Sequence, residues 1–411
     1  MHTGRFRFLS IALLGLSTVL ISHAADWPKY RGPGEDAQST EKLGSLSPSV
    51  LWKADVGIGN SSFVIADGRA FTMGNDGENK TSVFCFEAAT GKVLWEQGFP
   101  SDSTKGDFPG GKTPFHGGPN STPLIDGDYL YTVSRFGRVD CWKLASGENV
   151  WSFDWGKKWP LDRKQLPTWG YSSSPVIDGD RLFIEPGAPG ASMVCLDRNT
   201  GKILWQSGDD RAAYSTPLVA EIDGKNTLLA FNRFGLVGFD PENGQSRWDF
   251  EWETQYGVNS ASVLLCGDDR IFLSSGYGKG AAMVQVKDGK VEELWTTKRM
   301  KNKHTVSVFI DEHIYGFSEA ELTCINADTG EVKWVERGYG RGALVVADEK
   351  MIVQSETPAH LVIGEFSPDG FTEVWKSERQ FDEHSWTMPI LSNGLIFTRN
   401  VSGKIVVFDA R

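Results

Sequence analysis

The sequence predicts an all-β fold, an eight-bladed β-propeller whose blades are four-stranded antiparallel sheets. Three observations lead to this prediction. A segment ending in Trp recurs along the chain, and tight-turn dipeptides recur at matching places within it. The runs between the turns are short and rich in Val, Ile, Leu, Phe and Tyr, as β-strands require. The repeat accounts for nearly all of the 411 residues.

The recurring Trp sets the length of a blade. Its eight copies are 39 to 56 residues apart, close to the roughly 40–50 residues of a four-stranded propeller blade. Residues 172–205 show the unit best, with a small polar start, three strands, then Thr-Gly-Lys and Trp. The eight residues are Trp52, Trp95, Trp151, Trp205, Trp248, Trp295, Trp334 and Trp375.

Two kinds of turn divide each unit. The first is Asp-Gly, Asn-Gly or an acidic pair, which favours the positive φ angles of tight hairpins. The second lies shortly before the Trp and carries Gly. The first turns are at 67–68, 126–127, 178–179, 223–224, 268–269, 311–312, 348–349 and 393–394. The second turns are at 90–91, 146–147, 200–201, 243–244, 288–289, 329–330 and 369–370.

The last unit is split between the two ends of the chain. Residues 386–409 supply three strands and stop before a Trp strand, whereas residues 50–54 (Val-Leu-Trp-Lys-Ala) supply one strand with no unit of its own. We expect this N-terminal strand to complete the last blade, because ring closure leaves no large exposed sheet edge. Residues 50–411 are the predicted propeller domain, and residues 25–49 form an N-terminal lead segment.

The N-terminus is typical of a secretory signal. Two arginines precede an apolar run at 8–21, and residues 22–24 (Ser-His-Ala) suit a cleavage site near Ala24. We therefore predict a Sec-type signal peptide at 1–24 and a periplasmic or secreted mature protein. No later run is long enough to be a transmembrane segment. A net charge of −11 without a basic cluster argues against nucleic acid as a partner.

The five cysteines do not favour a disulfide framework. Cys85, Cys141, Cys195 and Cys324 occupy one strand position in four different units, and Cys266 lies at another position. The favoured interpretation is that they are small buried hydrophobic residues, and pairing of some of them is the alternative.

The unit runs from an apolar strand through Leu-Asp and Thr-Gly-Lys to Trp. This order resembles the PQQ-like (pyrroloquinoline quinone) propeller repeat. The resemblance covers about residues 50–411. It implies that the eight Trp are structural docking residues, each packed on a neighbouring blade near its turn Gly. Residues 27–33 (Trp-Pro-Lys-Tyr-Arg-Gly-Pro) also resemble the lead segment of exported propellers of planctomycete-type bacteria.

This resemblance leaves the function open between two groups. One group oxidises alcohols or sugars with PQQ and Ca²⁺. The other contains binders such as BamB, the propeller subunit of the outer-membrane β-barrel assembly machinery. The chain has no adjacent Cys pair of the kind common beside the quinone, no Glu–Asn–Asp set assignable to Ca²⁺, and no lipid-anchor Cys near the cleavage site.

We therefore predict an exported, BamB-like binding or scaffolding propeller with no cofactor, no catalytic residue and no metal site. The alternative is a PQQ-dependent alcohol or sugar dehydrogenase, a quinoprotein that holds PQQ with Ca²⁺. Further predictions concern where a partner or ligand binds.

The two faces of the propeller are expected to differ. One face, here called the hairpin face, carries the Asp-Gly and Thr-Gly turns. The other, here called the insertion face, carries the segments that lead into each blade and two long insertions, 99–118 and 155–170. Both insertions mix aromatic and basic side chains, so they are expected either to dock a protein partner or small ligand, or simply to pack over the blades.

Residues that lead into the inner strands face the predicted central channel, and these include Tyr214 and Trp386. Two matching Arg-Phe-Gly turns carry arginines that could hold a carboxylate or phosphate. The candidate ligand-binding residues are His116, Asn120, Arg135, Trp169, Tyr171, Arg233, Asn259, His304, Arg341 and His384.

Overall fold

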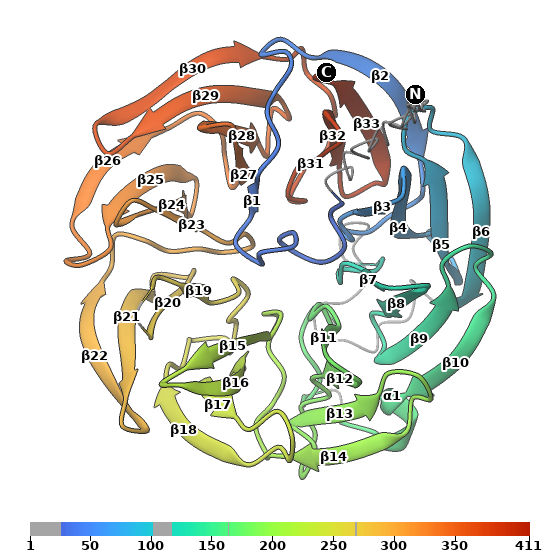
Figure 1. Cartoon of the computed structure of the whole chain (residues 1–411), viewed down its shortest axis with the longest axis vertical. Helices are drawn as coiled ribbons and strands as arrows, with labels where there is room; N and C mark the ends of the chain where they lie inside the picture. Colours follow the sequence, from blue (N-terminus) through green and yellow to red (C-terminus); the bar gives the residue numbers. More distant parts are fainter. Residues whose placement is uncertain (1–25, 102–116, 163, 268) are drawn as a thin grey trace, which may run out of the picture.

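Eight four-stranded antiparallel sheets surround a central axis, so the predicted eight-bladed propeller is confirmed (Figure 1). The structure is a computed structural model that describes residues 26–101, 117–162, 164–267 and 269–411. In each blade the first strand of the unit lies nearest the axis and the Trp-bearing strand lies outermost (Figure 1). The one helix among the described residues is α1 (Trp155–Lys158), a single turn.

The strands of blades 1 to 4, each from the axis outward, have the following bounds. Blade 1 comprises β3 (Val64–Ala66), β4 (Arg69–Asn75), β5 (Lys80–Glu87) and β6 (Val93–Pro100), and blade 2 comprises β7 (Leu124–Asp126), β8 (Tyr129–Val133), β9 (Arg138–Lys143) and β10 (Asn149–Asp154). Blade 3 comprises β11 (Val176–Asp178), β12 (Arg181–Ile184), β13 (Met193–Asp197) and β14 (Ile203–Ser207), and blade 4 comprises β15 (Leu218–Ile222), β16 (Lys225–Phe231), β17 (Gly235–Phe239) and β18 (Ser246–Glu251).

The remaining blades follow the same order. Blade 5 comprises β19 (Leu264–Leu265), β20 (Arg270–Ser275), β21 (Gly280–Lys287) and β22 (Lys290–Thr297), and blade 6 comprises β23 (Val308–Ile310), β24 (His313–Ser318), β25 (Glu321–Asn326) and β26 (Val332–Glu336). Blade 7 comprises β27 (Ala343–Ala347), β28 (Lys350–Gln354), β29 (Leu361–Ser367) and β30 (Gly370–Lys376), and blade 8 comprises β31 (Ile390–Ser392), β32 (Leu395–Arg399), β33 (Lys404–Asp409) and β2 (Ser49–Asp55).

The ring closes as predicted, because β2 is the outer strand of blade 8. It pairs antiparallel with β33, with Trp52 opposite Val407 and Lys53 opposite Val406. The N-terminal and C-terminal parts of the propeller are thereby joined by a sheet ladder rather than by side chains alone. This closure covers the edge of β33, which would otherwise be the unpaired outer edge of blade 8.

Every blade has a β-bulge in its outer strand, immediately before the Trp. In blade 1, Cys85 pairs with Trp95 and Phe86 pairs with Val93, so Leu94 is the extra residue. The same register shift occurs in all eight blades. A bulge increases the twist of an edge strand, which discourages edge-to-edge pairing with other molecules.

Most of the Trp residues after the bulges pack on the following blade. Six donate their indole N–H to a main-chain carbonyl there; for example, Trp151 donates to Arg198 O at 3.0 Å. The others in this group are Trp52, Trp95, Trp205, Trp295 and Trp334. In five of the six the ring also covers the turn glycine of that blade, as Trp151 covers Gly201.

Trp248 and Trp375 have different surroundings because the turns that they would reach are different. Trp248 packs on Gly238 of its own blade, and the second turn of blade 5 is only the dipeptide 288–289. Blade 8 has no second turn, since its two outer strands come from opposite ends of the chain. Trp375 instead meets the ring of Phe408 edge-on, with 6.2 Å between ring centroids.

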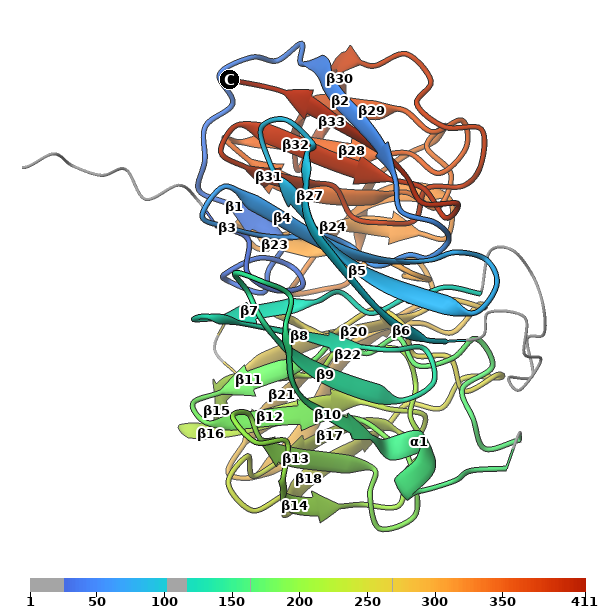
Figure 2. The same cartoon turned by 90° about the vertical axis from the view of Figure 1, so that its right-hand side faces the viewer.

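The lead segment lies across the hairpin face, opposite α1 (Figures 1 and 2). Trp27 exchanges two main-chain hydrogen bonds with Ile65 of blade 1, and Arg31 donates from Nη1 to Val263 O near blade 5 at 2.8 Å. The segment then forms β1 (Gln38–Ser39), which pairs in parallel with β27 of blade 7. These contacts connect blades 1, 5 and 7, which are widely separated around the axis.

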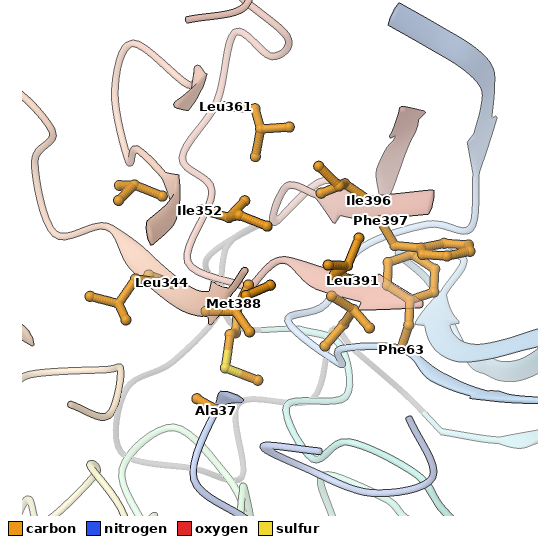
Figure 3. Close-up of a cluster of buried hydrophobic side chains, with 14 of the residues drawn as sticks. Ala37, Phe63, Leu344, Ile352, Leu361, Met388, Leu391, Ile396 and Phe397 are labelled. Carbon is orange, nitrogen blue, oxygen red and sulfur yellow. The ribbon is translucent and has the colours of Figure 1, made fainter. Parts of the chain in front are cut away.

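The largest apolar cluster spans blades 6 to 8, blade 1 and the lead segment. Figure 3 shows Met388 at its centre, with its sulfur directed toward Ala37 of the lead segment and with Leu344 and Leu391 beside it. All five cysteines are buried and unpaired, in agreement with the favoured interpretation. No helix in the part of the chain that the structure describes is long and apolar enough to cross a membrane.

Candidate functional site

A cavity of about 320 Å³ lies on the propeller axis and receives side chains from all eight blades. The segments leading into the inner strands provide most of its wall. Because side chains of an extended chain alternate, residues two apart face the same way and form two layers. The paired positions are Asn60 and Ser62, Asn120 and Thr122, Ser172 and Ser174, Tyr214 and Thr216, Val258 and Ser260, His304 and Val306, and Trp386 and Met388.

The two ends of the cavity differ. Tyr30 of the lead segment lines the end nearest the hairpin face, so this segment covers the axis on that side. Trp169, from the insertion 155–170, lines the cavity at the opposite end. The site is therefore directed toward the insertion face.

The wall also differs from one side to the other. Blades 1 to 5 present hydroxyl groups in the deeper layer, whereas blades 6 to 8 present Val306, Leu344 and Met388. The charged lining residues, Lys303 and Arg341, lie on the same side as these apolar residues. The cavity thus combines a hydroxyl-rich wall with an apolar wall that carries cations.

Hydroxyl groups of the deeper layer also join neighbouring blades. The main-chain N–H of Thr122 donates to Oγ of Ser174 at 2.9 Å, and that of Ser174 donates to Oγ1 of Thr216 at 3.0 Å. Thr216 continues the series to Ser262 of the next blade. Each donor lies two residues before an inner strand. These bonds therefore satisfy main-chain N–H groups that have no partner in the sheet.

A stack of three rings stands at the mouth of the cavity. Trp386 lies between His304 and His384, with ring centroids 4.9 and 5.4 Å apart and interplanar angles of 28° and 4°. Nδ1 of His384 is 2.8 Å from the hydroxyl of Thr357. The three rings come from blades 6 and 8, so the stack bridges the mouth beside blade 7.

Glu356 holds the central ring of this stack, Trp386, in place through a hydrogen bond. Its Oε1 accepts the indole N–H of Trp386 at 2.7 Å, and its Oε2 accepts the main-chain N–H of Arg341 at 2.9 Å. Burial alone would raise the pKa of Glu356, but these two hydrogen bonds and the nearby charges of Arg341 and His384 outweigh it and lower the pKa. The carboxylate is therefore a fixed anion that orients one aromatic and one cationic residue.

The other aromatic residues of the mouth form pairs. Trp169 lies 5.6 Å from Tyr214, centroid to centroid, and Nζ of Lys303 lies 4.4 Å from the ring centroid of Tyr277. Tyr256, which is 55% exposed, meets Tyr277 edge-on. Aromatic faces and cations thus surround the opening, a combination suited to binding.

Four predicted candidates line the cavity: Asn120, Trp169, His304 and Arg341. The channel-facing Tyr214 and Trp386 line it as well. His384 reaches the mouth through its stack with Trp386. His116 and most of the insertion 99–118 lie outside the described residues.

The other predicted candidates are not among the lining residues. Arg135 is 2% exposed and packs against Gly170, and Arg233 packs in the same way against Gly257. The structure thus gives both Arg-Phe-Gly arginines a packing role beneath the loop that leads into the next blade. Tyr171 donates to Pro186 O, and Asn259 donates to Asn232 O, so both stabilise loops.

Sequence reasoning missed Lys303, Glu356 and Tyr30. Lys303 directly precedes His304, and no repeated pattern marks its position. Glu356 lies in a turn of blade 7, and its role depends on a contact with blade 8 that no local pattern reveals. The alternation of small polar residues at 60–62, 120–122, 172–174 and 214–216 is the sequence signal that could have identified the wall.

The donor set of the cavity is poor in metal ligands. None of its lining residues is Asp or Glu, and no group of three or more His, Cys, Asp or Glu side chains suited to a metal occurs within the described ranges. Ca²⁺ takes about 6–8 oxygen ligands, in which carboxylates are prominent. The described residues of the cavity therefore do not fit a Ca²⁺-held quinone.

A family model described as "Outer membrane protein assembly factor BamB" matches residues 79–336, more than half of the chain. The outer membrane protein assembly factor BamB of Burkholderia pseudomallei is 23% identical over 273 residues, which are 64% of this chain and 62% of that protein. The 1-butanol dehydrogenase (quinone) of Thauera butanivorans is 29% identical over 146 residues, 32% of this chain and 22% of that enzyme. The chain spans less than two thirds of the length of both relatives.

Solved structures agree on the fold. BamB from Moraxella catarrhalis has a TM-score of 0.64 at 13% identity, covering 88% of this chain and 99% of that one. The computationally designed Ika8 protein has a TM-score of 0.61 at 10% identity, covering 89% and 99%. At such low identities the likeness shows the fold alone.

Proposed function

The chain belongs to the family of the outer membrane protein assembly factor BamB, and on that premise we propose that it is an exported, non-catalytic propeller that binds a partner at its insertion face. The observation that carries the proposal is the placement of the axial cavity. Most of its lining side chains come from the lead-in segments and the insertion 155–170, while the lead segment covers the opposite end. Binding residues on loops above a rigid scaffold are the usual arrangement of such proteins.

The chemistry of the mouth supports binding rather than turnover. Trp169, Tyr214, Tyr277 and Trp386 supply aromatic surface, which contributes strongly to protein interfaces. The most prominent carboxylate there, Glu356, is committed to Trp386 and Arg341. It therefore positions binding residues and does not face the cavity as an acid or base.

A PQQ-dependent dehydrogenase is the second candidate, favoured by the similarity to a quinone-dependent butanol dehydrogenase over about a third of this chain. Such an enzyme needs a metal-held quinone, and the described lining of this cavity offers hydroxyl and amide oxygens without a carboxylate. For this reason we rank it below the binding role.

Calorimetric titration of the mature protein with PQQ in the presence of Ca²⁺, followed by a dye-linked alcohol and sugar oxidation assay, separates the two candidates. We expect neither saturable heat nor dye reduction. Tight binding together with dye reduction would overturn the binding proposal in favour of the enzyme.

Site-specific photo-cross-linking tests the face. A benzophenone amino acid replaces Tyr256 on the insertion face, and in a matched variant it replaces Tyr129 beside a hairpin-face turn. In cells of the source bacterium we expect protein cross-links from position 256 and none from position 129. Cross-links from position 129 alone, or from neither position, would contradict the proposal.

A further inference from the structure

The charged side chains among the described lining residues of the axial cavity are basic, whereas the protein as a whole is acidic. The chain carries 53 acidic and 42 basic residues, yet the lining that the structure describes contains Lys303 and Arg341 and no acidic side chain. A cleft lined by one sign of charge within low-dielectric walls concentrates the field and attracts ions of the opposite sign. The cavity therefore favours an anionic ligand.

The two cations have weak internal partners. Nζ of Lys303 and Nε of Arg341 lie 3.8 and 3.6 Å from the same atom, Oε2 of Glu319. Nη1 of Arg341 lies 3.6 Å from Oε1 of Glu356. These separations exceed the roughly 2.7–3.2 Å of direct N–H···O hydrogen bonds, so the ammonium and guanidinium groups keep donors for a ligand.

The internal carboxylates are held mainly by uncharged donors. Oε1 of Glu319 accepts the main-chain N–H of Tyr277 at 3.0 Å, and Glu356 accepts from Trp386 and from the main chain of Arg341. The partial neutralisation that they provide keeps the cations stable when the site is empty. Because Lys303 and Arg341 already flank one carboxylate oxygen of Glu319, their spacing suits a carboxylate better than a larger anion.

The surface next to the cations is apolar. Val306 and Leu344 come from the same two blades as the cations, blades 6 and 7, and Met388 comes from blade 8; all three lie one layer deeper than the mouth. A ligand whose carboxylate stays at the mouth would place the atoms beyond it against these side chains. The volume of about 320 Å³ is at the lower end of the roughly 300–1,000 Å³ of small-molecule pockets, so the ligand is compact.

We propose that the axial cavity binds a compact organic carboxylate with an apolar body, its carboxylate held by Lys303 and Arg341 and its body packed on Val306, Leu344 and Met388. The carboxylate is either that of a free organic acid or that of the last residue of a chain. The inference is independent of protein docking at the insertion face, because cross-linking from position 256 can succeed or fail whatever the cavity holds.

Ligand-observed NMR and tryptophan fluorescence on the full mature protein test the proposal with four probes. The small pair is 4-cyclohexylbutyrate and its amide, and the chain pair is the peptide Gly-Gly-Gly-Leu with a free or an amidated C-terminus. We expect at least one free acid to bind at least tenfold more tightly than its amide, and added NaCl to weaken the binding. Binding of the small acid alone identifies a free acid as the source, and binding of the peptide acid identifies a chain end.

Variants locate the site. Lys303→Met and Arg341→Gln each remove one lining cation, and Lys279→Met removes a cation outside the lining residues. We expect the first two to weaken acid binding about tenfold and the third to leave it unchanged, with thermal unfolding checking that all three are folded. Equal binding of acid and amide, no binding of any probe, or an equal loss in Lys279→Met would overturn the proposal. The acid–amide comparison requires no variant, so a failure of one variant to fold does not remove the test.

Discussion

The indole N–H of Trp386 donates to Oε1 of Glu356 at 2.7 Å, across the boundary between blades 8 and 7. The other oxygen of Glu356 holds the main chain of Arg341 at 2.9 Å. One buried carboxylate therefore sets the position of an aromatic ring from one blade and of a cation from another. The geometry of the cavity mouth depends on how blades meet, because no single blade contains this arrangement.

Replacing Glu356 with Gln should destabilise the protein in a pH-dependent way. The folded-state pKa of Glu356 lies below its ordinary value of 4.5, so its carboxylate stabilises the fold above that pH and loses this contribution as pH falls through the folded pKa. We expect Glu356→Gln to lower the free energy of unfolding at pH 7 by about 1–2 kcal/mol, as for a charge-assisted hydrogen bond.

Urea unfolding at several pH values from 7 down to 3 measures this difference. The gap between wild type and Glu356→Gln should narrow as the pH falls below 4.5. Glu331→Gln, at an exposed position of a hairpin-face turn, is the control and should show no such gap. A gap that stays constant across this range would contradict the assigned role of the carboxylate.

The contribution of the contact between a docking Trp and a turn glycine can be tested by comparing two glycines of blade 3. A Cβ at Gly201 would lie 2.5 Å from the ring of Trp151, whereas a Cβ at Gly179 meets nothing within 4 Å. Both glycines have positive φ, +69° and +57°, so Ala is strained at both by about 1–2 kcal/mol. The steric clash at Gly201 adds a further cost, typically about 1–3 kcal/mol.

We therefore expect Gly201→Ala to lower the free energy of unfolding by at least about 1 kcal/mol more than Gly179→Ala. Chemical denaturation of the two variants side by side gives this difference. Equal losses would mean that Trp151 does not depend on a bare backbone at position 201.

Particular residues show which features of the fold and of the cavity the sequence predicts. The repeat predicts the blades, the hairpin turns and the closing strand, because each belongs to a local pattern that recurs along the chain. It did not reveal that Arg135 and Arg233 pack beneath Gly170 and Gly257. A turn arginine is normally exposed, and only the loop leading into the next blade, which has no regular pattern, covers these two.

The sequence predicts the lead segment as a separate stretch but does not predict its position. It lacks the strand periodicity of the blades, and its contacts join residues hundreds of positions apart, such as Arg31 and Val263. The cavity was predicted only in part for a similar reason. Asn120 and Arg341 lie at repeat positions that face the axis, whereas Tyr30 reaches the cavity from outside the repeat.

Truncation should separate the roles of the lead segment and the closing strand. A chain that begins at residue 42 lacks the contacts of Trp27, Arg31 and β1 but keeps β2. A chain that begins at residue 57 also lacks β2, and with it the outer strand of blade 8 and the docking of Trp52 on blade 1.

We expect the first chain to remain folded with a lower melting temperature, because its ring is still closed, and the second to lose cooperative unfolding altogether. Circular dichroism during thermal unfolding distinguishes the two. Cooperative unfolding of the chain that begins at 57, at a temperature near that of the full protein, would show that ring closure by β2 is dispensable.

Glu185 should give the opposite pH dependence to Glu356. It is 3% exposed, its Oε1 has no hydrogen-bond partner among the described residues, and burial raises its pKa well above the ordinary 4.5, with Asp210 adding to the effect and the main chain of Ala213 opposing it. A carboxyl whose folded-state pKa is raised favours the fold below the unfolded pKa and loses that contribution as pH rises through the folded pKa. Wild-type stability should therefore fall relative to Glu185→Gln above pH 4.5, by up to about 1.4 kcal/mol per pH unit until the folded pKa is reached.

The measurement is the difference in free energy of unfolding between Glu185→Gln and wild type at pH 4.5, 6 and 7.5, with the exposed Glu221→Gln as control. The variant need not be the more stable protein at low pH, since its amide brings two donors into a buried site. What matters is the slope, which should favour the variant as pH rises. A flat difference would mean that Glu185 is charged in the folded state and that a partner balances its burial.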